Sequence, residues 1–423
     1  MTDYIRKTTL DNGLRIVTES VDRVRSVAAG IWVRTGSRDE EENKAGITHF
    51  LEHMLFKGTA ERSAYDIALS LESAGGYLNA FTSNEYTCYY ARCLDTRLPL
   101  ALDVLSDMVA NSTLPEEEMV KEKKVVLEEM KMYRDSPEDY IFELFNSHLF
   151  RNHPLGRPII GFEDTVNNLT RSDLFDYIRD RYHPGNLLVS VSGNMNHDEV
   201  VRVTESLLGK GADAGSDRKE VPLTDYDVGC SIFQKPIEQT HMIVGRRGLW
   251  YDHPDKYLLL LANTVLGGGM SSRLHQNIRE KYGYCYSIGT FNQSFTDSGL
   301  FGVYIGTDRE YADHVRELIF VEFETLRSQP VPPQELKESK SQLKGKLLLS
   351  QESMNNRMTR IAKSELYFNR YISLDELVEK IDEVTDEQIM EFSKSFFDPD
   401  QYSEALLTPE DSGAGLNRLK EQV

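Results

Sequence analysis

The sequence contains no apolar run of the roughly 18–20 residues that a membrane-spanning helix needs. Its most apolar stretch, residues 257–266, is interrupted by Asn263 and followed by three glycines. The first ten residues contain neither a secretory apolar segment nor an amphipathic stretch rich in Arg and Ser. These absences predict a protein with no membrane span, and the cytoplasm is its expected location.

Cysteine is scarce, with 4 residues in a chain of 423, and no two of them form a C-x-x-C pair. A metal site or a disulfide framework built on cysteine is therefore not indicated. We interpret Cys88, Cys93, Cys230 and Cys285 as buried free thiols in a reducing compartment.

Basic residues are fewer than acidic ones, since 48 Lys and Arg stand against 68 Asp and Glu, for a net charge of −20. Binding to nucleic acid or to an anionic membrane needs a basic face, so neither is expected as the main role. The remaining composition, 40% hydrophobic and 27% charged, is that of an ordinary globular protein.

One sequence unit appears twice. Thr170 and Thr385, which are 385 − 170 = 215 positions apart, each precede apolar residues at helical spacing that end at a proline. Pro115 and Pro332 begin a second pair of similar segments, with an offset of 332 − 115 = 217. A Gly-rich polar stretch separates the copies. We therefore predict a unit over 1–210, a linker over 211–228 and a homologous unit over 229–423.

Strands and helices are mixed within each copy without strict alternation, which predicts an α+β fold with mixed, mostly antiparallel sheets. The expected strands of the first copy are 26–33, 86–91 and 187–192, and its expected helices are 64–73, 98–110 and 116–133.

The segment Ile47–Lys57 carries the chemistry. On a helix, His49 and His53 share one face because they are four residues apart, so both can bind one metal ion. Glu52 lies on the same side, where a carboxylate can take a proton from water. Two core histidines are the alternative, but a buried His–Glu–His cluster without a cation is costly. This H-x-x-E-H pattern therefore predicts a zinc site.

A catalytic zinc ion usually has three protein ligands and one open position. The expected helix 116–133 offers Glu122, Glu128 and Glu129 as the third ligand. Glu122 and Glu129 are two turns apart and share a face, whereas Glu128 points about 100° away from Glu129. The spacing alone does not choose among the three.

Together, His49-x-x-Glu52-His53 and the later Glu129 resemble the insulinase/pitrilysin-type zinc metallopeptidases. The texts HFLEHMLFKGT and VVLEEM are especially similar to the processing peptidase β subunits of mitochondria and their bacterial relatives. The resemblance covers essentially the whole chain. It implies one Zn²⁺ per chain held by His49, His53 and Glu129, with Glu52 as the general base and Glu122 supporting the ligands.

The resemblance also assigns the second copy to a non-catalytic wall of the substrate chamber. At an offset of about 213, Ala262, Val265 and Leu266 replace His49, Glu52 and His53, and Lys346 stands at the Glu129 position. The second copy still carries Arg279 and Tyr286, which match a family pair directed at the bound peptide, where they can stabilise an oxyanion. A surface arginine and a core tyrosine are the alternative interpretation.

Two segments are expected to bind substrate. Residues 75–83 resemble the family's edge strand, which pairs with an extended peptide through Asn79, Ala80 and Phe81. Asp139 and Glu143, at i and i+4, match acidic positions that receive a basic residue near the cut, unless they form only a solvated helix face.

The resemblance implies a zinc-dependent endopeptidase that cleaves extended or unfolded peptides. Complete chambers in the family contain four such units, so a chain with two implies a dimer. We favour a homodimer, because one chain holds both the zinc motif and the Arg279–Tyr286 pair; a heterodimer with a partner that lacks the zinc motif is the alternative. A non-catalytic scaffold and a peptide-binding clamp are the alternative functions.

Overall fold

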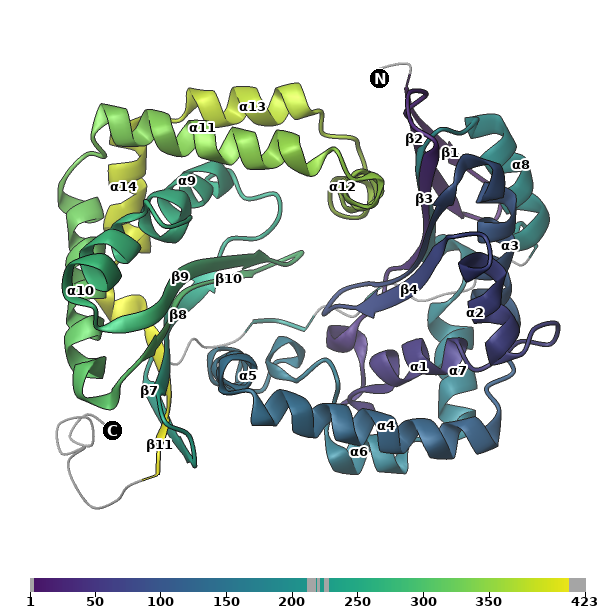
Figure 1. Cartoon of the computed structure of the whole chain (residues 1–423), viewed down its shortest axis with the longest axis horizontal. Coiled ribbons are helices and arrows are strands. Elements are labelled where there is room, and N and C mark those ends of the chain that lie inside the picture. The colour runs from purple at the N-terminus through teal and green to yellow at the C-terminus, as the bar shows by residue number, and fades with distance from the viewer. Residues whose placement is uncertain (1–3, 211–217, 219–220, 224–227, 411–423) are drawn as a thin grey trace. The chain divides into compact units, whose positions relative to one another are not determined.

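The computed structural model describes residues 4–210, 218, 221–223 and 228–410, which form two compact units. Each unit is a β-sheet with helices packed on it (Figure 1). The predicted α+β class is confirmed. Within the described ranges, no helix is both long and apolar enough to cross a membrane.

The sheet of the first unit has six strands in the order β1-β2-β6-β3-β5-β4, so β4 is an edge strand. Only β2 and β6 pair in parallel, and the other neighbours are antiparallel. The strands are β1 Ile5–Thr9, β2 Arg15–Ser20, β3 Ser26–Val33, β4 Tyr77–Thr82, β5 Thr87–Leu94 and β6 Leu187–Gly193. The strands predicted at 26–33, 86–91 and 187–192 are therefore confirmed, with small shifts at their ends.

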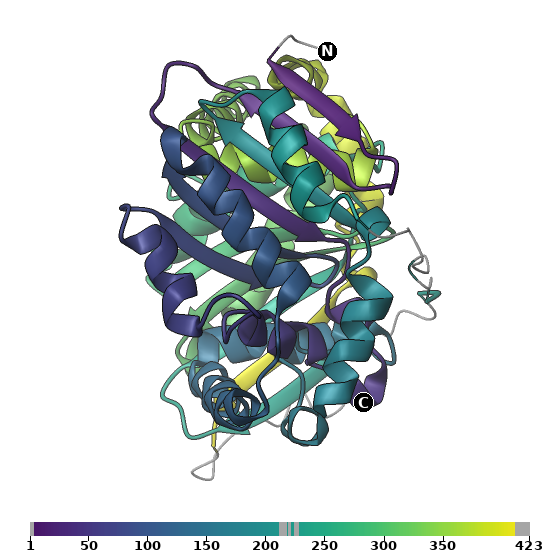
Figure 2. The ribbon, with the colours of Figure 1, turned by 90° about the vertical axis from the view of Figure 1, so that its right-hand side faces the viewer.

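Both faces of this sheet are buried, which explains the continuous apolar sequence of β3. Because side chains alternate along a strand, Val27 and Ile31 join the core on one face, whereas Ala28 and Trp32 join the core on the other. Figure 2 looks onto the first of these layers, where α3 and α8 cover the strands. The helices of the unit are α1 Ile47–Leu55, α2 Ala64–Glu72, α3 Leu98–Asn111, α4 Glu116–Asp135, α6 Glu163–Asn168, α7 Arg171–Arg181, α8 His197–Leu208 and α12 Met354–Phe368.

The sheet of the second unit has five strands in the order β7-β11-β8-β10-β9. Its strands are β7 Cys230–Lys235, β8 Thr240–Gly248, β9 Cys285–Ser294, β10 Gly299–Thr307 and β11 Ser403–Pro409. Its helices are α5 Pro137–Leu149, α9 Lys256–Gly267, α10 Ala312–Ser328, α11 Pro333–Ser350, α13 Leu374–Glu383 and α14 Asp386–Phe396. Without β1, the first sheet has the same order and the same single parallel pair as the second.

The predicted duplication extends to individual side chains. Thr170 caps the N-terminus of α7 and Thr385 caps that of α14, each by accepting a hydrogen bond from the backbone three residues on. On the helices α4 and α11, Lys123 and Lys340 each donate to two backbone carbonyls just before these caps. The two units are therefore copies of one structural pattern.

Each sheet is covered on one face by a helix that comes from the other half of the sequence. The first unit combines residues up to Lys131 with Arg157–Pro222 and Leu349–Tyr371, and the remaining described residues form the second. Thus α5 packs on β8 and β11, and α12 packs on β2, β3 and β6. The compact units therefore differ from the expected bounds 1–210 and 229–423, because Met132–Gly156 belongs to the second unit and Leu349–Tyr371 to the first. Most of the expected linker 211–228 lies outside the described residues.

Buried ion pairs hold α12 on the first sheet. Glu19, which is 1% exposed, pairs with Arg357 at 2.8 Å and Arg360 at 3.3 Å, both on α12. In a further pair, α12 supplies the acidic member: Glu365 pairs with Lys7 of β1 at 2.7 Å. A buried charge that loses its partner is costly, so these pairs favour this docking of α12 over others.

Candidate metal centre

Helix α1 begins at a tightly packed turn. Gly46 has a φ of 93°, which favours glycine, and a Cβ atom there would meet the carbonyl oxygen of Ile160 at 2.5 Å. The buried carboxyl group of Glu40 accepts hydrogen bonds from the backbone N–H groups of Gly46 at 2.7 Å and Thr48 at 2.8 Å. Burial raises the pKa of Glu40 to about 7. The turn and this cap fix the direction in which α1 starts.

The faces of α1 have different surroundings. Phe50, Leu51 and Met54 are fully buried in the core, whereas His49 and His53 are partly exposed on the other side. The two imidazole rings lie side by side, with centroids 4.7 Å apart. The i, i+4 spacing therefore places both histidines as the sequence predicted.

The third candidate ligand comes from α4, which passes beside α1 (Figure 1). Glu129 places Oε2 at 3.8 Å from Nε2 of His49 and 3.6 Å from Nε2 of His53. Glu128 points into solvent and pairs with Lys131 at 2.7 Å. The structure thus brings Glu129, and not Glu128, to the histidines.

The donor set fits a zinc ion. Ligand atoms of His49, His53 and Glu129 all lie within 4.8 Å of one another, and they form the one such group found in the described ranges. Ligands about 2.0–2.2 Å from a tetrahedral ion are about 3.4 Å apart, close to the 3.6 Å and 3.8 Å seen here. Burial lowers the pKa of His49 to about 3, so its imidazole is neutral, as a metal ligand must be.

Glu122 stands behind His53 on α4. Its Oε1 lies 2.8 Å from Nδ1 of His53, and its Oε2 lies 2.6 Å from Nζ of Lys57. Burial by itself would raise the pKa of Glu122, but these two contacts hold it below its ordinary value. The structure therefore places Glu122 where the resemblance implied a supporting carboxylate. Lys57 was not among the predicted site residues.

Glu52 lies one residue before His53, and its carboxyl group is largely buried. Burial raises its pKa, although a hydrogen bond from Thr82 opposes the shift. Thr82 Oγ1 donates this hydrogen bond to Oε2 of Glu52 at 2.5 Å. Thr82 was missed by sequence reasoning, although it lies within the expected edge strand 75–83 and close to Phe81.

Residues 15–163 match the family model described as insulinase (peptidase family M16), and residues 168–343 match the model described as peptidase M16 inactive domain. The chain belongs to peptidase family M16.

Relatives of this M16 chain carry matching names. A protein of Bacillus subtilis named an uncharacterised zinc protease is 41% identical over 409 residues, which cover 96% of this chain and 98% of the relative. A protein of Streptomyces coelicolor with the same kind of name is 41% identical over 393 residues, covering 91% of this chain and 85% of the relative.

Two solved structures share the fold. A protease from Helicobacter pylori superposes with a TM-score of 0.88 at 24% identity, covering 96% of this chain and 99% of that one. A Pseudomonas fluorescens structure described as a peptidase M16 inactive domain has a TM-score of 0.89 at 19% identity, with 96% and 98% covered.

The segment 75–83 of the M16 chain contains the edge strand β4, Tyr77–Thr82. Among the strands of the described ranges, β4 pairs only with β5, so the backbone groups along its other side are not used by the sheet. The three residues predicted to bind substrate through this segment, Asn79, Ala80 and Phe81, all lie on β4. Asn79 Oδ1 accepts a hydrogen bond from the Ala80 amide at 2.8 Å. The ring of Phe81 packs edge-on against Trp32, with ring centroids 5.7 Å apart. The side chain of Phe81 therefore packs against the core of the first unit and stabilises β4.

Arg279 and Tyr286 belong to the second unit, whereas His49, His53 and Glu129 belong to the first. Arg279 lies in the π-helix His275–Glu280 and donates to Nε2 of His275 at 2.6 Å. Tyr286 is 80% exposed on the edge strand β9, so it is not the core tyrosine of the alternative interpretation. The guanidinium carbon of Arg279 lies 5.8 Å from the centroid of the Tyr286 ring.

Asp139 and Glu143 lie on α5, which packs on the sheet of the second unit. Asp139 is exposed in the first turn. Glu143 is partly buried, and this burial raises its pKa while the charge of Arg134 opposes the shift. Glu143 is thus the less solvated member of the predicted acidic pair.

The equivalent place in the second unit has a different chemistry. Ala262, Val265 and Leu266 are buried in its core. Lys346, at the position of Glu129, donates from Nζ to the carbonyl of Gly268 at the end of α9, over 2.6 Å. An apolar helix capped by an ammonium group thus replaces the His–His–Glu cluster, in agreement with the sequence.

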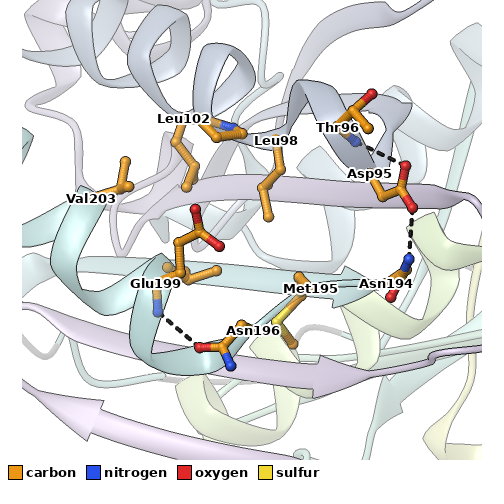
Figure 3. Close-up of a pocket in the computed structure, with 11 residues that line it drawn as sticks. Asp95, Thr96, Leu98, Leu102, Asn194, Met195, Asn196, Glu199 and Val203 are labelled. Carbon is orange, nitrogen blue, oxygen red and sulfur yellow. Dashed lines mark hydrogen bonds between the residues drawn. The ribbon is translucent and has the colours of Figure 1, made fainter.

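A cavity of about 230 Å³ lies elsewhere in the first unit, between α3 and α8 (Figure 3). Its polar groups have partners: Asp95 accepts from Arg25 and Asn194, and Asn196 accepts from the backbone of Glu199. The candidate metal ligands and Glu52 do not line this cavity. His49, His53 and Glu52 lie on α1, and Glu129 lies on α4.

Proposed function

We propose that this chain is a zinc-dependent endopeptidase that cleaves extended or unfolded peptides. The observation that carries the proposal is the convergence of His49, His53 and Glu129, with the carboxyl group of Glu52 beside them. The names of the B. subtilis and S. coelicolor relatives support it.

Nε2 of His49, Nε2 of His53 and Oε2 of Glu129 would hold the ion. Bound zinc supplies Lewis acidity toward a peptide carbonyl and a water molecule. Glu52 takes the proton from that water and later delivers it to the leaving amine. Thr82 occupies Oε2 of Glu52 and leaves Oε1 to carry the proton. The raised pKa of Glu52 suits this exchange, because a proton carrier works best when its pKa is near the working pH.

The edge strand β4 would bind the substrate as an added β-strand. Main-chain hydrogen bonds along Asn79, Ala80 and Phe81 would hold an extended peptide with little regard for its side chains. Most segments of a folded domain are already paired or packed and cannot add to this edge, which is why extended or unfolded peptides are the proposed substrates. Asp139 and Glu143 add a preference for basic residues near the cut.

The dimer is part of the same proposal. Arg279 and Tyr286 would stabilise the oxyanion formed at the carbonyl, and they would do so in the partner of a homodimer. The exposure of the Tyr286 side chain supports its availability for such a contact.

The decisive experiment compares the purified chain with Glu52→Gln. Zinc content is measured by mass spectrometry, and cleavage is mapped on a peptide library. We expect about one zinc ion per chain in both proteins and a loss of cleavage of at least about a thousandfold in the variant. A wild-type chain that binds no zinc, or a variant that cleaves as well as wild type, would leave the scaffold as the better function. Peptide binding that chelators do not weaken, without cut products, would indicate the clamp.

A further inference from the structure

Lys57 lies just beyond α1 and is held by its backbone. Its amide donates to the carbonyl of Met54 at the end of the helix, at 3.1 Å. The next residue, Gly58, has a φ of 129° and forms a β-bridge with Ser63. The chain therefore turns sharply after Lys57, and its side chain extends from a fixed point toward α4.

The side chain of Lys57 ends at the carboxylate that supports His53. Its Nζ lies 2.6 Å from Oε2 of Glu122, and Oε1 of Glu122 lies 2.8 Å from Nδ1 of His53. Lys57 and His53 thus each contact a different oxygen of this carboxylate. In the described part of the chain, Lys57 is the one lysine or arginine paired with Glu122.

The burial of Glu122 makes this ion pair necessary. Its side chain is 6% exposed, whereas that of Lys57 is 26% exposed. A buried carboxylate without a countercharge is costly, and it would turn toward water if its surroundings allowed. The ammonium group of Lys57 pairs with this carboxylate and keeps it aimed at His53.

The orientation of Glu122 decides which nitrogen of His53 can bind metal. A carboxylate at Nδ1 accepts the hydrogen on that atom, so the lone pair lies on Nε2, which faces Glu129 and His49. Nδ1 of His49, in contrast, is buried and has no hydrogen-bond partner among the described groups. Among the described contacts of the two histidines, only His53 thus has a carboxylate at its Nδ1 atom.

The second unit provides an internal comparison. At the offsets that relate the two copies, Met270 replaces Lys57 (57 + 213), Ser339 replaces Glu122 (122 + 217) and Leu266 replaces His53 (53 + 213). The copy that lacks the metal ligand therefore also lacks the carboxylate and the ammonium group. This pattern is expected if the three residues act together.

We infer that Lys57 is a positioning residue for zinc, acting through Glu122 on the ligand His53. The inference rests on the proposed function, because it requires a zinc ion at His49, His53 and Glu129. It assigns to Lys57 a part of the zinc affinity and of the geometry of the site, not a contact with the substrate.

The test uses Lys57→Met, which removes the ammonium group, and Lys57→Arg, which keeps the charge. Lys124→Met is the matched control, because Lys124 is exposed on α4 and its loss changes the net charge equally. The zinc dissociation constant of the full chain is measured by competition with a chelator. We expect Lys57→Met to bind zinc about 10- to 100-fold more weakly, Lys57→Arg within about threefold of wild type, and Lys124→Met unchanged. The visible spectrum of the Co²⁺-loaded proteins should change in Lys57→Met alone.

A second variant separates loss of folding from loss of positioning. Lys57→Gln keeps a hydrogen-bond donor and should show a smaller loss of zinc affinity than Lys57→Met. In a Glu122→Gln background, Lys57→Met should cause no further loss, since its effect passes through Glu122. Wild-type affinity in Lys57→Met, or an equal loss in the Glu122→Gln background, would overturn the inference for Lys57. Failure of the wild-type chain to bind zinc would instead overturn the proposed function.

Discussion

Thr82, the last residue of the edge strand β4, donates a 2.5 Å hydrogen bond to the carboxyl group of Glu52 on α1. The strand proposed to bind the peptide and the residue proposed to move the proton are thereby joined directly. A peptide added to β4 would lie on a strand whose end already fixes the position of Glu52.

Thr82→Val should lower kcat by about 10- to 100-fold and change KM little, because a hydrogen bond to an ionised group contributes about 1.5–3 kcal/mol. Thr82→Ser keeps the hydroxyl group and should stay within a few-fold of wild type. Steady-state kinetics on one peptide substrate measure both. Equal kcat values for Thr82→Val and wild type would show that Glu52 needs no such support.

Glu129→Gln should lose most of the bound zinc, because an amide oxygen is a much weaker ligand than a carboxylate for this ion. Glu128→Gln is the matched control, since Glu128 is the preceding residue, is exposed and pairs only with Lys131 among the described groups. Metal analysis after dialysis against a weak chelator compares the two variants. Zinc loss in the Glu128 variant but not in the Glu129 variant would contradict the assigned ligand set.

Glu40 should make the stability of the chain depend on pH. Its pKa is raised by burial to about 7 in the folded chain, against an ordinary value of 4.5. Below pH 4.5 the carboxyl group is protonated in both states, and between pH 4.5 and 7 only the folded state holds the proton. The free energy of unfolding therefore falls as pH rises through this window, by up to about 3 kcal/mol from this group.

Urea denaturation at pH 5 and pH 7.5 checks the effect of Glu40. Glu40→Gln has no proton to lose, so the difference between wild type and variant should shrink or reverse at the higher pH. The variant loses one of the two backbone hydrogen bonds at Gly46 and Thr48, at a constant cost of about 1 kcal/mol. A difference that is the same at both pH values would mean that the folded carboxyl group titrates normally.

Two variant chains, one with Glu52→Gln and the other with Tyr286→Phe, are co-expressed so that they can form mixed dimers. Activity should be restored if Arg279 and Tyr286 act on the zinc site of a partner. Each variant alone should be nearly inactive. Half of randomly formed dimers are mixed, and each of these has one intact site, so about a quarter of the wild-type rate is expected. Light scattering of the mixture establishes the dimer. A dimer without restored activity would place the tyrosine and the zinc ligands of one site in the same chain.

The zinc motif could be predicted because it is local. His49, Glu52 and His53 lie within five consecutive residues, and helical geometry by itself puts them on one side of α1. The caps at Thr170 and Thr385 and the strand at Ser26–Val33 are local in the same sense. The duplication was visible because both copies keep these local signals in the same order.

The contacts that complete the site are not local, and they required the fold. Spacing along α4 shows that Glu122 and Glu129 share a face, but it does not show that this face meets α1. The resemblance to known metallopeptidases implied their roles, whereas Lys57 and Thr82 emerged only once α1, α4 and β4 were placed together.

The sequence by itself thus determined the α+β class, the repeated unit and the pair of histidines on one helix face, because each depends on residues close together in the chain. Only the tertiary structure decided that Glu129 rather than Glu128 faces the histidines and that Thr82 donates a hydrogen bond to Glu52. It also decided that α5 packs on the second sheet and α12 on the first. The periodicity of an amphipathic helix shows which of its faces is buried, but it does not show which sheet that face will cover. For α12 that choice depends on buried pairs such as Glu19 with Arg357 and Arg360, whose members are more than 300 residues apart.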